Sequence, residues 1–114
     1  MPYLLKTKLW LEKDGRKVFG DGPLDILERI EKSGSLRQAA AQINMSYSQA
    51  WRLIRMLERN LGFKILLKQA GGAGGGYSSL TPEAKRLTAA YGAFRREADS
   101  ALGELYQKYF PEDV

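Results

Sequence analysis

The sequence predicts an α+β fold in which two short β-hairpins accompany a group of packed helices and one long C-terminal helix. Three observations predict it. Apolar residues from Leu5 to Leu11 alternate with polar ones, which is the two-residue period of a strand. The patterns that begin at Ser35 and Ser46, 11 residues apart, are each typical of the start of a helix. A glycine-rich stretch at residues 70–76 separates two further strand-like runs.

Composition sets the limits of the function. The 114 residues suffice for one domain with a buried core, and 44% of them are hydrophobic. The chain has no Cys and no His, which excludes disulfides, zinc–thiolate sites and histidine-based catalysis. We therefore expect no metal, no cofactor and no enzymatic activity. No apolar run approaches the roughly 20 residues that span a bilayer and no signal peptide is recognisable, so we expect a cytoplasmic protein without membrane contact.

The N-terminal residues 4–19 predict a β-hairpin. Leu5, Leu9 and Leu11 share one face of the first strand, which could therefore be buried. Asp14-Gly15 is a common two-residue hairpin turn, and a shorter apolar run follows it. The sequence thus predicts strand, turn and strand before the first helix.

A helix is expected from about Pro23 to the residue before Gly34. Asp21 or Gly22 can cap its N-terminus, and Pro23 suits its first turn. Apolar residues at helical spacing follow, and Gly34 supplies the left-handed residue that ends many helices.

The next segment predicts two helices joined by a very short turn. Ser35 and Ser46 are each followed three residues later by a glutamine, which is the pattern of a capping box. A short helix over residues 36–43 lies between them, and residues 44–45 form the turn. Together with the preceding helix this describes a three-helix core with a helix-turn-helix over residues 23–61. The second helix of such a motif enters the major groove of DNA.

The third predicted helix, residues 47–61, has an apolar side and a cationic side. Trp51 falls on the apolar side and is expected in the core, whereas the hydroxyl of Tyr47 could also reach a phosphate. Arginine, glutamine and serine on the other side can hydrogen-bond to base edges, although an ordinary solvated face would have the same pattern. The candidate DNA-binding residues of the two helices and their caps are Ser35, Arg37, Ser46, Tyr47, Ser48, Gln49, Arg52 and Arg55.

Positive charge is concentrated on this part of the chain. Residues 35–76 contain six Lys or Arg and a single acid, Glu58, which gives a net charge of +5, equal to the charge of the whole chain. A local cationic surface of this kind suits a polyanionic partner.

Residues 63–80 predict a second hairpin with a glycine-rich tip, the wing of a winged helix. Glycines let the backbone lie against a sugar–phosphate edge. The spacing from Gly71 to Gly76 also fits a phosphate-binding loop, but the Lys-Ser/Thr that such a loop requires is absent. An oxyanion site on this loop and a tip without a partner remain the alternatives. The candidate DNA contacts here are Lys68, Gly72, Gly74 and Gly75.

A long helix is expected over residues 82–109. Thr81 can cap it, with Pro82 and Glu83 in the first turn. Apolar residues recur along it at steps of four and three, as in a coiled-coil seam. The seam predicts dimerisation, with packing inside one chain or binding of another protein by an adaptor as alternatives. The candidate dimerisation residues are Leu87, Tyr91, Phe94, Ala98 and Leu105.

Three sequence elements, in this order and spacing, resemble the DNA-binding domain of ModE-type molybdate-dependent transcriptional regulators, a winged helix related to the LysR type. They are G-S-L-R-Q-A-A from Gly34, M-S-Y-S-Q-A-W from Met45 and G-G-A-G-G-G from Gly71, followed by Leu80-Thr81. The resemblance covers nearly the whole chain.

The resemblance implies a homodimer that binds double-stranded DNA at an inverted-repeat operator, with recognition helices about 34 Å apart. It also implies that Ser48, Gln49, Arg52 and Arg55 face the groove, and that the glycine-rich tip touches the flanking backbone. Members of the family carry C-terminal molybdate-binding modules, for which 114 residues leave no room. We therefore expect a stand-alone regulator, with any molybdate sensing supplied by a separate partner.

Overall fold

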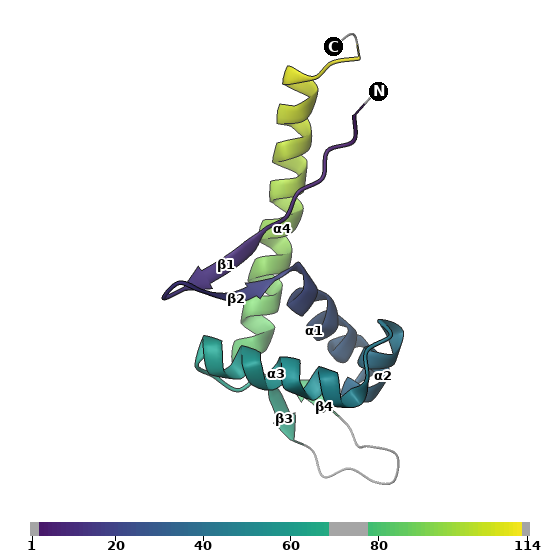
Figure 1. Ribbon diagram of the computed structural model, residues 1–114, viewed down its shortest axis with the longest axis vertical. Helices are drawn as coiled ribbons and strands as arrows, with labels where there is room; N and C mark the ends of the chain where they lie inside the picture. The colour runs from purple at the N-terminus through teal and green to yellow at the C-terminus, as the bar shows by residue number, and fades with distance from the viewer. Residues whose placement is uncertain (1–2, 69–77, 113–114) are drawn as a thin grey trace.

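The computed structural model describes residues 3–68 and 78–112, and it is an elongated molecule of 60 × 30 × 21 Å (Figure 1). Two antiparallel two-stranded sheets accompany four helices among these residues. Leu11 pairs with Phe19 in the first sheet, and Leu66 pairs with Leu80 in the second. The elements are β1 (Trp10–Lys13), β2 (Arg16–Gly20), α1 (Asp21–Ser33), α2 (Leu36–Gln42), α3 (Tyr47–Leu61), β3 (Leu66–Lys68), β4 (Ser78–Leu80) and α4 (Pro82–Tyr109).

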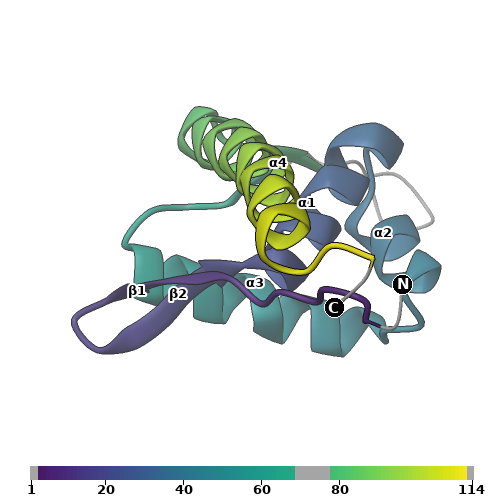
Figure 2. The same ribbon diagram turned by 90° about the horizontal axis from the view of Figure 1, so that it is seen from above.

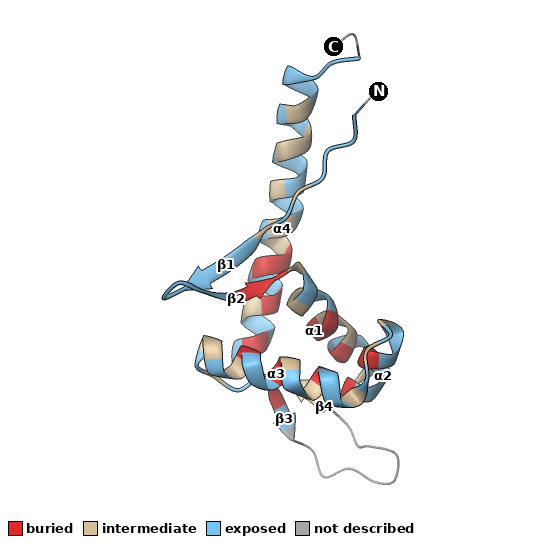
Figure 3. Ribbon diagram, viewed as in Figure 1, coloured by how far each residue is buried: buried red, intermediate tan, exposed pale blue. Residues whose placement is uncertain are grey.

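The core lies where α1, α2 and α3 meet β2, the wing strands and the first half of α4 (Figure 3). The apolar stripe of each helix faces this centre, as its helical spacing requires. The ring of Phe19 meets the ring of Tyr91 edge-on, with centroids 5.2 Å apart. The buried apolar side chains are Phe19, Ile26, Leu27, Ile30, Leu36, Ala39, Ala40, Ala50, Ile54, Leu57, Ile65, Leu66, Leu80, Ala84 and Tyr91.

The N-terminal hairpin is shorter than the sequence predicts, because it begins at Trp10 rather than at residue 4. Residues 3–9 run beside the second half of α4 instead (Figures 1 and 2). Side chains of α4 bind their carbonyl groups: Arg95 Nη2 donates to Thr7 O at 3.2 Å, and Tyr106 Oη donates to Tyr3 O at 3.0 Å. These donors replace a partner strand, and Leu11 on the expected inner face is 40% exposed.

The start of α1 also differs from the prediction. Gly20 is the N-cap and no side chain caps the helix, so neither Asp21 nor Gly22 has that role. The Asp21 carboxylate points to α4 instead, where Oδ1 lies 2.8 Å from the Tyr91 hydroxyl and Oδ2 lies 3.2 Å from Arg95 Nη2. Asp21 therefore joins α1 to α4.

α4 spans the predicted residues 82–109, and the Thr81 hydroxyl accepts the backbone N–H of Ala84 at 3.2 Å. Its predicted seam, however, is divided between two environments. Tyr91 is buried in the chain's own core and is not available to a partner, which corrects one of the five candidate dimerisation residues, whereas Leu87 is only partly buried against that core. Phe94 and Leu105 are half exposed. Across residues 3–68 and 78–112, no helix is both long enough and apolar enough to cross a membrane.

Candidate nucleic-acid interface

α2 and α3 are joined by a tight turn that sets their crossing. Asn44 adopts a left-handed conformation with φ +56°, which asparagine tolerates better than most residues. The backbone N–H of Met45 then donates to Ala40 O at 2.9 Å and closes the turn. Ala39 and Ala50 are fully buried, and their small side chains let the two helices approach closely. The predicted helix-turn-helix is confirmed.

The two predicted capping boxes differ. At α3 the box is complete: Ser46 Oγ accepts the N–H of Gln49 at 3.1 Å, and Gln49 Oε1 accepts the N–H of Ser46 at 3.0 Å. At α2, Ser35 Oγ accepts the N–H of Gln38 at 3.1 Å, but the N–H of Ser35 donates to Ser33 Oγ at 3.2 Å. Ser33 thus accepts the backbone N–H that a capping box would give to the side chain of Gln38.

The complete box limits what Gln49 can do at a base edge. Its amide oxygen already accepts one backbone N–H, so one lone pair of Oε1 and the two Nε2 hydrogens stay available in this structure. A bidentate contact with adenine needs both the oxygen and the nitrogen of the amide. The cap therefore fixes the direction of the amide, and Gln49 can contact a base only in the orientation that the cap allows.

The outer side of α3 is exposed along its length, and the inner side packs in the core. Ala50, Ile54 and Leu57 face inward and are buried. Arg52 is exposed and makes no hydrogen bond or ion pair with any described residue, so its guanidinium is free to bind a base or a phosphate. The exposed polar side chains of this face are Ser48, Gln49, Arg52, Arg55 and Arg59.

A row of four side chains, two aromatic rings between two arginines, crosses from α2 to α3. The Arg37 guanidinium lies 4.1 Å from the centroid of the Tyr47 ring, and the Arg55 guanidinium lies 5.6 Å from that of Trp51. The Tyr47 and Trp51 rings meet edge-on with centroids 6.2 Å apart. Contacts of this kind contribute about 0.5–1 kcal/mol each at exposed sites, and they orient both arginines.

Trp51 packs against the core, as the sequence predicts, but only in part. Like Tyr47 it is half-buried, with part of the ring against the core and part beneath an arginine. The spacing of Tyr47, Trp51 and Arg55, at steps of four residues, is the signal that could have indicated this row.

The base of the wing is fixed to the helices. The N–H of Ser78 donates to Gly34 O at 2.8 Å, and Ser78 Oγ accepts the N–H of Leu36 at 3.3 Å. β4 is therefore anchored at the start of α2. Lys68 is the last residue of β3, and the candidates Gly72, Gly74 and Gly75 lie outside the described residues.

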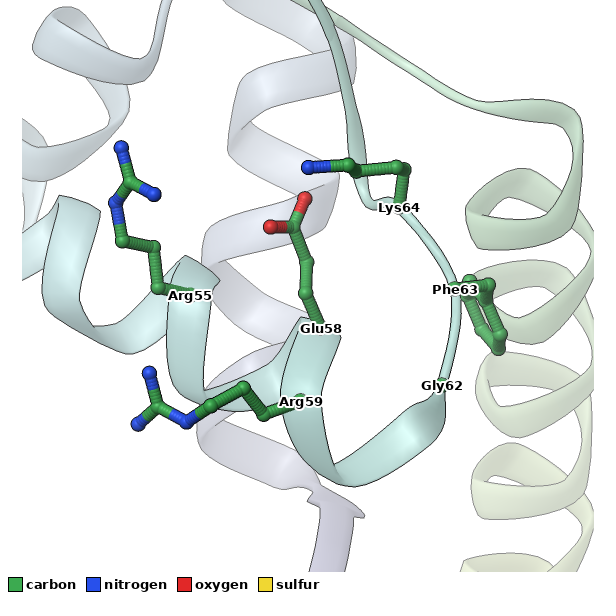
Figure 4. Close-up of a pocket in the computed structure, with 6 residues that line it drawn as sticks. All are labelled: Arg55, Glu58, Arg59, Gly62, Phe63 and Lys64. Carbon is green, nitrogen blue, oxygen red and sulfur yellow. The ribbon is translucent and has the colours of Figure 1, made fainter.

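Two cationic residues that the sequence analysis did not count among the candidate DNA contacts lie at the end of α3 and just beyond it. Arg59 and Lys64 line an open cavity of about 510 Å³ together with Arg55 and Glu58 (Figure 4). The cavity forms because Gly62, with φ +87°, ends α3 and turns the chain back toward β3. No local sequence pattern predicts it, since it depends on how the chain returns past the helix.

Comparison with known proteins gives the same picture. Residues 23–85 match the model of the bacterial regulatory helix-turn-helix protein, lysR family. Among curated proteins, the chain is 32% identical over 102 residues to the molybdenum transport protein ModE of Azotobacter vinelandii, covering 90% of this chain and 38% of that protein. It is 34% identical over 97 residues to the DNA-binding transcriptional dual regulator ModE of Escherichia coli K12, covering 83% of this chain and 34% of that protein. The chain thus spans little more than a third of these relatives.

Two solved structures resemble the fold. The first is Vibrio fischeri DarR, crystallised in complex with DNA, with a TM-score of 0.58 and 19% identity over 75% of this chain and 28% of that one. The second is a probable transcriptional regulator of Pseudomonas aeruginosa, with a TM-score of 0.50 and 27% identity over 77% of this chain and 26% of that one. The winged helix predicted from the sequence is confirmed by these likenesses.

Proposed function

Because this chain belongs to the lysR family of bacterial regulatory helix-turn-helix proteins, we propose that it is a sequence-specific DNA-binding transcription regulator without catalytic activity. The observation that carries the proposal is the outer side of α3, where arginines are exposed and Arg52 has no partner among the described residues. The relative from Escherichia coli is itself described as DNA-binding.

In the proposed complex, α3 lies in the major groove. Arg52 and Ser48 in its first turns reach base edges, and Arg52 can hold a guanine with two hydrogen bonds. Arg37 and Arg55, held on Tyr47 and Trp51, flank the reading residues. Ser35 and Ser46 keep their hydroxyl protons for phosphates, because each hydroxyl only accepts a bond in its cap.

We further propose that the regulator is a homodimer on an inverted-repeat operator. The support is an open groove of about 570 Å³ on the outer side of α4, lined by Ala90, Ala93, Phe94, Glu97, Ala98 and Ala101. Phe94 is 53% exposed and Leu105 is 50% exposed beside it, which favours a second copy as a cover. Two-fold symmetry would place the α3 helices about 34 Å apart, or a multiple of that distance.

The test begins with the wild-type chain and a library of random DNA duplexes. Several rounds of selection should enrich one sequence, and fluorescence anisotropy then compares that duplex with a shuffled one. Arg52→Ala should weaken binding of the selected duplex by about 1–3 kcal/mol and change binding of the shuffled one little. Arg16→Ala is the control, because Arg16 is an exposed arginine at the hairpin tip.

One result would contradict the proposed function, and another would contradict only the role given to Arg52. One is a library that enriches no sequence, with no measurable affinity for any duplex in dilute buffer. The other is an equal loss of affinity for both duplexes in Arg52→Ala. Arg52 would then be a phosphate contact, and other residues would read the sequence.

A further inference from the structure

The cavity at the end of α3 carries positive charge that the protein itself neutralises only in part. Arg55, Arg59 and Lys64 take part in none of the ion pairs of the described residues, whereas Arg29 and Arg95 each face a carboxylate. In Figure 4 the charged ends of the three cations lie around the same opening, with the Glu58 carboxylate between them. The lining carries a net charge of +2, so it suits an anion.

Glu58 is held by the backbone rather than by these cations. Its Oε2 accepts the N–H of Ile65 at 2.9 Å. A carboxylate bound in this way fixes the returning chain against α3, and it lowers the charge of the cavity by one without closing it.

The segment that carries Lys64 is held from both sides. The Thr81 hydroxyl donates to Lys64 O at 2.6 Å, and the N–H of Thr81 donates to Ile65 O at 2.9 Å. Glu58 holds the N–H of Ile65 from the opposite side. The backbone of Lys64 is therefore fixed while its side chain is exposed, so binding a ligand orders the side chain but not the backbone.

A second cavity continues this one between α3 and β3. It is lined by Trp51, Leu66, Leu67 and Thr81, and it shares Arg55, Glu58 and Lys64 with the first. The two together form a groove, named here the α3–β3 groove, that separates the recognition helix from the wing. If α3 lies in a major groove and the wing beside the next minor groove, the DNA strand dividing these grooves has to pass between the two elements.

We propose that the α3–β3 groove is an oxyanion site that binds a phosphodiester of the DNA backbone, with Arg55 and Lys64 as its opposing cations and Arg59 beside them. The inference rests on the proposed function for the source of the anion, since a free inorganic phosphate has the same chemistry. Arginine can bind two phosphate oxygens and lysine acts as a point charge, so the pair fits a phosphate crossing the groove.

The first experiment measures affinity against salt for wild type, Lys64→Gln and the control Lys13→Gln, an exposed lysine of β1. Both the selected and the shuffled duplex are used. Lys64→Gln should weaken the two duplexes by the same factor, roughly 5-fold at low salt, and lower the log–log salt slope by about one per protomer. The inference would be overturned if Lys64→Gln behaved like Lys13→Gln, or if it lost affinity for the selected duplex alone. The proposed function would stand in both cases.

The second experiment replaces DNA by inorganic phosphate, with chloride at equal ionic strength as the reference. The Nε–Hε resonances of Arg55 and Arg59 should shift with phosphate in wild type, and shift less in Lys64→Gln. If they do so although wild type binds no duplex, the oxyanion site stands and the DNA source is wrong, together with the proposed function. No shift beyond chloride, combined with an unchanged salt slope, would remove the site altogether.

Discussion

Two buried threonines near the start of α4 illustrate how single hydroxyl groups affect this fold. The Thr81 hydroxyl donates to Lys64 O at 2.6 Å and accepts the N–H of Ala84 at 3.2 Å. The Thr88 hydroxyl is buried with no partner among the described residues. A buried polar group without a hydrogen bond costs free energy that its isosteric apolar replacement recovers.

Replacement by valine should therefore act in opposite directions at the two positions. Thr88→Val should raise the free energy of unfolding by about 1 kcal/mol, and Thr81→Val should lower it by about 2–3 kcal/mol, since it loses a helix cap and a second hydrogen bond. Urea unfolding of both variants beside wild type measures the two changes. A destabilised Thr88→Val would mean that this hydroxyl has a partner after all.

Tyr91 predicts how stability depends on alkaline pH. Burial, together with the adjacent Asp21 carboxylate, raises the pKa of its phenol to about 12. The unfolded phenol titrates near its ordinary pKa of 10, so between these pH values the unfolded chain releases the proton and the folded chain keeps it. The stabilisation is complete below pH 10 and falls as the pH rises to 12, by about 2–3 kcal/mol in total.

Tyr91→Phe removes this phenol and should remove this part of the pH dependence. The free energy of unfolding falls between pH 9 and pH 11 in wild type, and in Tyr91→Phe that fall should be smaller by about 1 kcal/mol. Ultraviolet absorbance of phenolate should also show one tyrosine of wild type that titrates late and that is missing in the variant. Parallel curves for the two proteins would contradict the assigned pKa.

At the scale of an element, the first turn of α3 combines a structural and a proposed binding role in one residue. Gln49 closes the capping box with its Oε1, and its side chain lies on the face proposed to enter DNA. Glutamate can make the same cap with an oxygen, and its negative charge interacts favourably with the N-terminal end of the helix dipole.

Gln49→Glu should therefore stabilise the fold while it weakens DNA binding. We expect the free energy of unfolding to rise by about 0.5 kcal/mol. Affinity for any duplex should fall about 10-fold or more, because a carboxylate then faces the phosphates. Thermal unfolding and anisotropy on the same preparation measure both effects, and an unchanged affinity would show that this turn does not face DNA.

The elements differ in how far the sequence determines them. α3 and α4 have their predicted bounds because serine, threonine, proline and glycine at their ends encode the caps locally. The prediction of a strand from residue 4 was wrong. The partners of this segment, Arg95 and Tyr106, lie about 90 residues or more away in the chain, and they belong to a helix rather than a strand. The α3–β3 groove was missed for a different reason: Lys64 and Arg55 are near in sequence, but they line one cavity only through the turn at Gly62, whose direction the sequence pattern does not give.

At the scale of the whole molecule, α4 connects a compact half to a projecting half. Its first turns lie in the core, and its second half extends beyond it (Figure 3). Residues 3–9 cover one side of the projecting part, through Arg95 and Tyr106. On the opposite side Phe94 and Leu105 are half exposed, although the heptad-like spacing places apolar residues there. A two-fold dimer through α4 requires one self-complementary patch, and the uncovered side offers such a patch.

Ala101→Glu tests this arrangement without disturbing the protomer, because Ala101 is exposed in the single chain and lines the uncovered groove. In a dimer it would bring two carboxylates into an apolar interface, so sedimentation should change from dimer to monomer. Binding of the selected inverted repeat should weaken about 100-fold or more, whereas a single half-site should bind as before, since α3 is untouched.

Gln107→Glu is the control for that variant, because it adds the same charge to α4 at an exposed position beneath residues 3–9, away from the groove. It should leave the mass of the particle and the affinity unchanged. If Ala101→Glu sediments like wild type and keeps full affinity for the inverted repeat, the apolar side of α4 is not the dimer interface. Its exposed phenylalanine would then need another cover, and the spacing of the two α3 helices would be set elsewhere in the molecule.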